Sequence, residues 1–173
     1  MRLEKYISTE KELELIELLS CRVLENGYNA SNTIVVTVSS DYSAITGMLM
    51  RHNLTFDGEI ADGFSVEVPY PDQKWNSQFV FELKSMFDIH SSKFENKTLL
   101  LVENAIIRGG NYTFLCDWIS QSYSKLKLKT LTLFENTNSR FKSDFVGEYY
   151  NDDIHDLTFH FERENKHWTN FVH

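Results

Sequence analysis

One segment of the chain, Thr98 to Thr113, constrains the fold more than any other. It begins with an apolar run that ends at Val102, continues through Glu103-Asn104, and then contains the glycine pair Gly109-Gly110. An apolar run without alternation is typical of a strand covered on both faces, as in parallel sheets. The glycines allow the backbone to turn sharply into the helix that we expect over about 112–123. The segment therefore predicts a strand, a loop and a helix of an α/β sheet.

The rest of the chain also alternates between strand and helix patterns, and only two prolines interrupt it. Thr9 and Glu12 fit a capping box at the start of a first helix, and Gly27 is a suitable stop for it. This order predicts an α/β fold with three layers, a mostly parallel sheet flanked by helices. We expect a single domain over 1–173, with 1–30 as an N-terminal helical segment. Further strands are expected at Thr33–Val38, Gly63–Tyr70, Leu128–Phe134 and Asp156–Glu162, and further helices at Ala44–His52 and Trp75–Ile89.

Composition narrows the classes of function. The formal net charge is -8 and the pI is near 5.2, which argues against a general nucleic-acid groove. No apolar stretch is long enough for a membrane span, and the charged N-terminus is unlike a signal peptide, so we expect a cytoplasmic protein without membrane contact. Cys21 and Cys116 lie in apolar helical patterns, which predicts buried thiols rather than a disulfide. The six histidines have no metal-ligand spacing, so no metal site made by protein ligands is expected.

Three polar loops are expected at one edge of the sheet. In parallel sheets ligands bind outside the carboxyl ends of the strands, and helix starts there expose N–H groups that suit phosphate. The loops at this edge are Ser39–Ser43, Glu103–Asn111 and Glu135–Phe141. A simpler interpretation stays open for two of them, because Ser39 to Asp41 suit a helix N-cap and Asn136 to Arg140 suit an ordinary polar loop.

The central loop resembles the phosphate-binding segment of the type I phosphoribosyltransferases. That family has a buried strand ending in two acidic residues, two apolar residues, one variable position and a Thr-Gly-x-Thr loop. Here Glu103-Asn104, Ala105-Ile106, Ile107 and Arg108 to Asn111 follow in that order without a gap. More weakly, Thr33 to Ser43 resembles the family's pyrophosphate loop region, and Leu131 to Glu148 is similar to a region of the purine-type members. Phe159, Phe161 and Trp168 resemble the area of the nucleobase, although packing is the simpler role for Trp168.

The resemblance implies a set of roles for these residues. Glu103 and Asn104 would be the catalytic pair that holds the ribose hydroxyls, and Ser39 and Ser40 would contact pyrophosphate. Mg²⁺ would be bound through phosphoribosyl pyrophosphate rather than by the protein. Three positions depart from the family pattern: Asn104 replaces an acid, and Arg108 and Asn111 replace hydroxyl residues. The 5′-phosphate would lie on the segment formed by Ile106, Ile107, Arg108, Gly109, Gly110 and Asn111.

Two functions therefore stay open. The first is an enzyme that transfers ribose 5-phosphate to a purine-like base with loss of pyrophosphate. The second is a catalytically inactive module that binds a nucleotide or phosphosugar, or a regulatory protein on the same scaffold. A receiver-like signalling domain fits poorly, because no acidic pair follows the first strand. The partner in either case is a small molecule, and the first helix either docks on the sheet or forms a homodimer contact.

Overall fold

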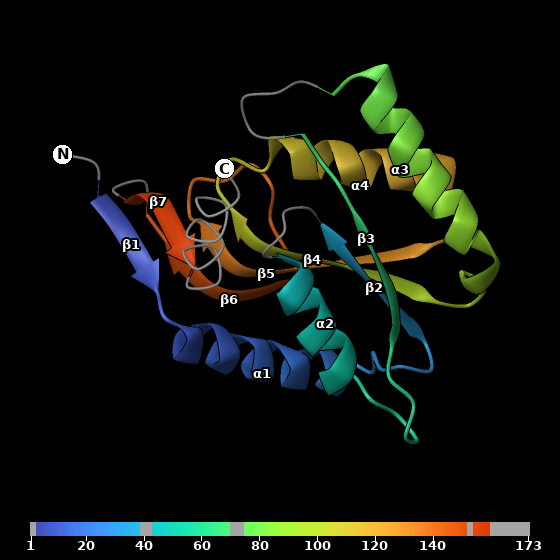
Figure 1. Ribbon diagram of the computed structural model, residues 1–173, viewed down its shortest axis with the longest axis horizontal. Coiled ribbons are helices and arrows are strands. Elements are labelled where there is room, and N and C mark those ends of the chain that lie inside the picture. The colour runs from blue at the N-terminus through green and yellow to red at the C-terminus, as the bar shows by residue number, and fades with distance from the viewer. Residues whose placement is uncertain (1–2, 39–42, 70–74, 152–153, 160–173) are drawn as a thin grey trace, which may run out of the picture.

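The computed structural model of the protein describes residues 3–38, 43–69, 75–151 and 154–159. Strands and helices alternate through most of this length (Figure 1). The strands are β1 (Leu3–Ile7), β2 (Thr33–Val38), β3 (Asp62–Val66), β4 (Thr98–Ile106), β5 (Lys127–Asn136), β6 (Phe145–Tyr150) and β7 (Ile154–Phe159). The helices are α1 (Thr9–Glu25), α2 (Ser43–Asn53), α3 (Ser77–His90) and α4 (Gly110–Ser122), with a short 3-10 turn at Ser91–Lys93.

The main sheet has five parallel strands in the order β3-β2-β4-β5-β6. The register places Thr37 of β2 opposite Val102 of β4, and Ile106 of β4 opposite Glu135 of β5. After β2 the chain adds β3 on one side, and from β4 onward it builds the other side of the sheet. The direction of winding therefore changes between β2 and β4, which confirms the expected α/β architecture.

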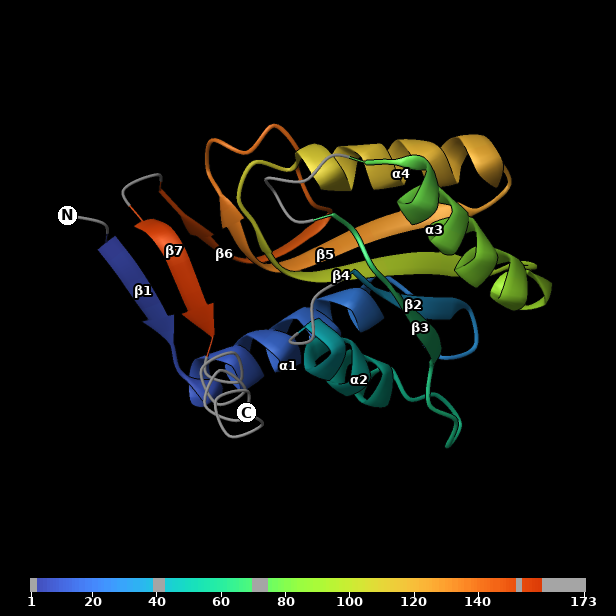
Figure 2. The same ribbon diagram turned by 45° about the horizontal axis from the view of Figure 1, so that its top comes forward.

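Two apolar clusters hold the layers together, one on each face of the sheet. Figure 2 shows α1 and α2 on one side of the sheet and α4 on the other. On one face α1 and α2 cover the sheet, and Leu19 and Met50 are fully buried there. On the other face α3 and α4 pack through Leu83, Phe87 and Leu115. The helix expected at Trp75–Ile89 corresponds to α3, and its buried residues Leu83 and Phe87 face the sheet, because both lie in this second cluster.

The two ends of the described chain form a separate sheet of two parallel strands, β1 and β7. The expected N-terminal helical segment over 1–30 contains α1, but a strand that was not expected, Leu3–Ile7, precedes this helix. The last predicted strand is present, but it spans Ile154–Phe159 and pairs with β1 instead of joining the main sheet. Its predicted part beyond Phe159, together with Phe161 and Trp168, lies outside the described residues.

Several predicted boundaries shift. The N-cap of α1 is Ser8 rather than Thr9, because the Ser8 side chain accepts from the Lys11 N–H. Gly27 has a φ of +84° just after the helix, which confirms its role as a stop. β4 extends beyond Val102 to Ile106, and α4 begins at Gly110, so the expected loop is much shorter than predicted. β6 was not predicted at all.

The cysteines differ from each other. Cys21 is exposed, so the expectation of a buried thiol is wrong for it, since it lies on the solvent side of α1. Cys116 is half-buried, and burial is the main cause that raises the pKa of its thiol to about 12. Both are free thiols. Within the described residues, no helix has the length and apolar character required to cross a membrane.

Candidate functional site

The candidate site lies at the carboxyl edge of the sheet, where the winding direction changes. β2 ends at Val38 beside β4, and α2 and α4 begin close to this edge (Figure 1). Open α/β sheets bind ligands in this position, because the strands on either side lead their loops away from each other. Ser39 and Ser40, the predicted pyrophosphate contacts, lie outside the described residues.

Glu103 and Asn104 lie within β4 rather than after it, so their side chains leave opposite faces of the strand. Asn104 is only 5% exposed, and its Oδ1 accepts a hydrogen bond of 2.7 Å from the Thr46 hydroxyl of α2. Glu103 is half-buried, and its Oε1 accepts a 2.9 Å bond from the backbone N–H of Asn104. The pair predicted from the sequence thus links β4 to α2 on one face and carries a carboxylate on the other.

The pKa of Tyr112, in the first turn of α4, is affected by its burial and by the charge of Glu103. Burial is the main cause that raises the pKa of this phenol well above its ordinary value, and the negative charge of Glu103 is the next cause. The Tyr112 hydroxyl is buried and has no hydrogen-bond partner among the described residues. The Glu103 carboxylate lies on the face of the sheet that α4 covers, because Leu99 and Leu101 leave β4 on the same side and pack in the cluster under this helix.

Gly109 forms the N-cap of α4 with a φ of +77° and provides no side-chain cap. The connection from β5 to β6 packs against it: a Cβ at this position would lie 2.4 Å from Phe141 Cβ and 2.8 Å from Ser139 Oγ. The Arg140 N–H also donates to the Arg108 carbonyl at 3.4 Å. Both views show these segments side by side (Figures 1 and 2). Glycine is required here by its backbone angle and by this close packing.

The remaining predicted residues lie around the same turn. Ile106 ends β4 with its side chain in the core, whereas the next residue, Ile107, is 45% exposed. Arg108 is exposed, and its guanidinium makes no ion pair with the residues that the structure describes. Gly110 is the first residue of α4, and a Cβ on it would meet nothing within 4 Å. Asn111 Nδ2 donates to the Pro69 carbonyl at 2.6 Å, so one of its donors holds the chain that follows β3.

The β5–β6 connection is held by Glu135, a fully buried carboxylate. Its Oε2 accepts from the Ser143 N–H at 2.8 Å, and Lys142 Nζ lies 3.3 Å from its Oε1. Lys142 also donates to the Thr137 carbonyl. These contacts give Lys142 a structural role, in line with the simpler interpretation of this loop.

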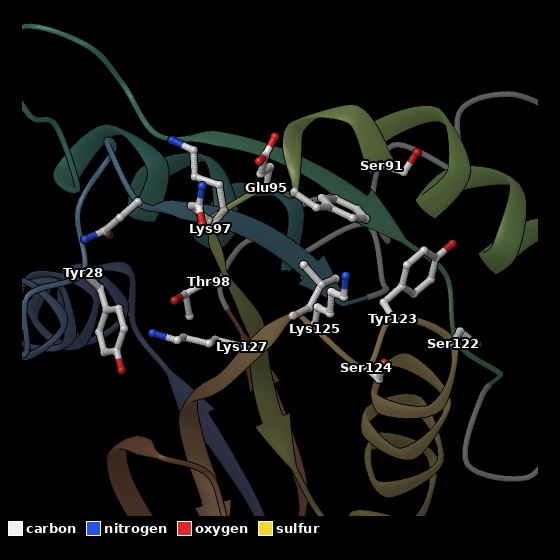
Figure 3. A pocket seen from close by; sticks show the side chains of 14 residues that line it. Tyr28, Ser91, Glu95, Lys97, Thr98, Ser122, Tyr123, Ser124, Lys125 and Lys127 are labelled. Carbon is white, nitrogen blue, oxygen red and sulfur yellow. The ribbon is translucent and has the colours of Figure 1, made fainter.

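A hollow of about 1090 Å³ lies at the opposite edge of the sheet, where β4 and β5 begin (Figure 3). Lys97, Lys125 and Lys127 are among its lining residues. The carboxyl end of α4 also reaches it through Ser122 and Tyr123. Cations near a helix carboxyl end offset its partial negative charge, so the helix already accounts for lysines here. We do not place the functional site in this hollow.

Three contacts of the site were not predicted from the sequence. They join Thr46 to Asn104, Ser139 to Gly109, and Pro69 to Asn111. Each joins residues far apart in the chain. Only the position of Thr46 could have been predicted, because the helix that follows β2 must begin near the point where the winding direction changes.

The fold is similar to solved purine phosphoribosyltransferases. The xanthine-guanine-hypoxanthine phosphoribosyltransferase of Helicobacter pylori is 15% identical with a TM-score of 0.66, and the match covers 98% of this chain and 99% of that one. The purine phosphoribosyltransferase of Pyrococcus horikoshii is 11% identical with a TM-score of 0.65, covering 90% of this chain and 92% of that one.

A hypothetical protein of Neisseria gonorrhoeae, solved with bound ppGpp, is 11% identical with a TM-score of 0.67, over 100% of this chain and 99% of that one. No protein-family model and no curated protein sequence matches this chain. At these identities the likeness concerns architecture. The chain therefore has the fold of the type I purine phosphoribosyltransferases, as the segment around Glu103 to Asn111 predicts.

Proposed function

We propose that the chain binds a phosphorylated ribose compound, either phosphoribosyl pyrophosphate or a purine nucleotide, at the carboxyl edge of the sheet. The observation that carries this proposal is the start of α4. Its N-cap, Gly109, has no side chain to satisfy the first N–H groups, and the residue directly before it, Arg108, is exposed and positively charged. Helix N-termini with free N–H groups attract phosphate through hydrogen bonds and through the helix dipole.

The neighbouring groups suit the rest of such a ligand. Arg108 can form a two-pronged hydrogen bond with phosphate oxygens, which a lysine cannot match in geometry. Glu103, within the preceding strand β4, offers a carboxylate for a ribose hydroxyl. Ile107, 45% exposed beside them, offers an apolar surface and no group for proton transfer. The segment therefore carries groups that can bind a phosphorylated ribose, but few groups that can transfer a proton during catalysis.

The comparisons support the choice of ligand class. Two of the similar structures are named as purine phosphoribosyltransferases, and the Neisseria protein was solved with a guanosine nucleotide. Such enzymes act on phosphorylated ribose compounds, so these are the first ligands to test with this chain. A cytoplasmic location agrees with that chemistry, and we include it in the proposal.

The proposal is tested by titrating the protein with phosphoribosyl pyrophosphate and with guanosine monophosphate (GMP) in a calorimeter. We expect Glu103→Ala to weaken binding by about tenfold, since it removes a charge-assisted hydrogen bond. Glu82→Ala is the matched control, because Glu82 is exposed on α3 and bonds only Gln78 among the described residues. Equal affinity in both variants would show that β4 does not carry the site.

Transfer of ribose 5-phosphate to a purine-like base is the second candidate. The retained carboxylate of Glu103 favours it, while the neutral Asn104 counts against it. Release of pyrophosphate from phosphoribosyl pyrophosphate, measured across a panel of purine bases, separates the two. Turnover would establish the enzyme, and binding without turnover would establish the binding module.

A further inference from the structure

The outer face of α3 carries the most exposed large apolar side chains among the described residues. Phe81 and Ile89 are each 70% exposed, and the next such residue of the described chain, Met48, is 62% exposed. Phe81 and Ile89 lie about two turns apart on one helix, with Ser85 between them. Residues at this spacing lie on one side of a helix, so the three form a continuous stripe. We call Phe81, Ser85 and Ile89 the outer stripe of α3.

The fold itself does not use the outer stripe. α3 packs inward through Leu83 and Phe87, and the Phe87 ring contacts Phe64 of β3 and Trp118 of α4 at centroid distances of 5.3 and 5.4 Å. Figures 1 and 2 show α3 along the outside of the fold, beside α4. Large apolar side chains that gather on a surface and stay exposed mark interaction sites. The outer stripe is therefore a candidate surface for contact with another protein chain.

The outer stripe is complementary to itself. It has a large apolar residue at each end and a small residue in the middle. The Ser85 hydroxyl donates to the Phe81 carbonyl of the same helix at 2.8 Å, so its donor is already used. A two-fold axis at Ser85 would set two copies of α3 antiparallel, with Phe81 of each copy against Ile89 of the other. The small side chain at the axis would let the two helices approach closely.

The charges beside the outer stripe fit the same arrangement. Lys84 and Asp88 lie on one flank of it, and Lys84 Nζ donates to Asp88 Oδ2. The other oxygen of Asp88 accepts from the Tyr123 hydroxyl at 2.9 Å, which holds the carboxylate in place. In an antiparallel pair this flank meets itself, so each Lys84 lies between its own Asp88 and that of the other copy. Copies with a formal net charge of -8 repel each other, whereas this flank carries one charge of each sign.

We propose that the outer stripe of α3 is a self-association surface, at which two copies of this chain pair antiparallel through Phe81, Ser85 and Ile89. The inference goes beyond the proposed function and does not depend on the ligand site. The alternative expected from the sequence, a contact through the stripe of α1, is excluded because Leu19 and Val23 pack on the sheet. Few apolar residues take part, so the contact is smaller than standard interfaces of about 1,600 Å². We expect a weak dimer with a Kd on the order of 10–100 µM.

Sedimentation velocity of the wild-type chain from about 1 to about 500 µM tests the proposal. We expect the sedimentation coefficient to rise from that of a monomer towards that of a dimer. Phe81→Glu should weaken the association by about tenfold or more, because a charge would be buried in the contact. Phe56→Glu is the matched control, since Phe56 is 51% exposed on the turn before β3, and it should associate as the wild type does.

Two results of this measurement would overturn the proposal. One is a wild-type chain that stays monomeric at every concentration, which would leave the outer stripe without a second copy as its partner. The other is a Phe81→Glu variant that associates like the wild type, which would place the contact elsewhere. Thermal unfolding checks that each variant is folded. If Phe81→Glu does not fold, Ile89→Arg takes its place in the same comparison.

Exchange of the flanking charges tests the antiparallel orientation. Lys84→Glu and Asp88→Lys each bring like charges together across the axis, so each variant alone should associate about tenfold more weakly than the wild type. An equal mixture of the two variants restores opposite charges at both positions. It should therefore associate about as strongly as the wild type. A mixture that associates no better than the separate variants would contradict the antiparallel pairing.

Cross-linking locates the axis. Ser85→Cys, made in a Cys21→Ser chain to remove the exposed native thiol, should give a covalent dimer when an oxidant is added, because the two introduced thiols meet at the axis. Ser120→Cys in the same background is the matched control. Ser120 is exposed on α4, and its hydroxyl also donates to the carbonyl one turn before it, at 2.8 Å. Equal yields of covalent dimer from both variants would overturn the proposed contact.

Discussion

The amino and carboxyl edges of the main sheet lie at opposite ends of α4 and therefore meet opposite partial charges. The amino edge holds the hollow of about 1090 Å³, where three lysines lie beside the carboxyl end of α4 (Figure 3). The carboxyl edge holds the start of the same helix, with Gly109 at its N-cap and Arg108 before it. Carbonyl groups and partial negative charge end α4 in the hollow, whereas free N–H groups begin it at the site. We therefore expect an anion to bind at the carboxyl edge, where α4 begins, and not in the larger hollow, where α4 ends.

The largest effect is expected from Gly109→Val, which tests whether the turn at the carboxyl edge is needed. The side chain would be strained at a φ of +77° and would press on Phe141 and Ser139. We expect unfolding to become easier by about 2–4 kcal/mol and phosphate binding to be lost. Chemical denaturation and calorimetry measure the two effects.

Gly110→Ala is the matched control for that variant. A Cβ at Gly110 would meet nothing within 4 Å, and alanine favours the helix more than glycine does. Stability should rise slightly and GMP binding should persist. A Gly109→Val variant as stable as Gly110→Ala would contradict the packing described between α4 and the β5–β6 connection.

A moderate effect is expected from charge removal at the two edges. Arg108→Gln should weaken GMP binding by about fivefold and lower its dependence on salt, because an exposed phosphate contact is lost. The double variant Lys125→Gln and Lys127→Gln removes two cations from the hollow and should leave that affinity unchanged. Weaker binding in the double lysine variant, with unchanged binding in Arg108→Gln, would show that the anion binds at the amino edge.

The smallest effect concerns the buried phenol beside the site. Tyr112→Phe removes a hydroxyl that has no partner among the described residues, so stability at neutral pH should rise by up to about 1 kcal/mol. Burial raises the pKa of Tyr112 in the folded chain, and the unfolded chain therefore loses this proton first as pH rises. Above the ordinary pKa of 10.0 the wild type should lose stability faster than the variant.

Denaturant unfolding at neutral pH and above pH 10.0 checks both parts of that prediction. Tyr123→Phe is a useful contrast, because the Tyr123 hydroxyl donates to Asp88 at 2.9 Å and its loss should not stabilise the chain. A clear loss of stability in Tyr112→Phe would mean that its hydroxyl has a partner after all.

The buried part of the fold could be predicted from the sequence, since burial on both faces leaves an apolar run. Thr33–Val38 and the run from Thr98 are such cases, and both are central strands. β6, Phe145–Tyr150, was missed because it is an edge strand whose side chains are mostly half-exposed and which contains a glycine. β1, Leu3–Ile7, was missed because its charged residues resemble the start of the following helix.

The site was predictable only in part. The spacing from Glu103 to Gly109 placed a carboxylate, a tight turn and a helix start in sequence order, because these are local features. The orientation of Asn104 depends on Thr46, and the need for glycine at 109 depends on Phe141. Such contacts arise from packing between elements, so no local pattern in the chain contains them.

The parallel pairing of β1 with β7 has a consequence for how the protein forms. Leu3 and Ile154 are neighbours in this small sheet, although nearly the whole described chain separates them. Closing a loop of that length is among the slowest kinds of contact to form. During synthesis β1 is made first and must wait for β7, so the main sheet has time to assemble before the ends meet. The completion of this pair would be the last event of folding.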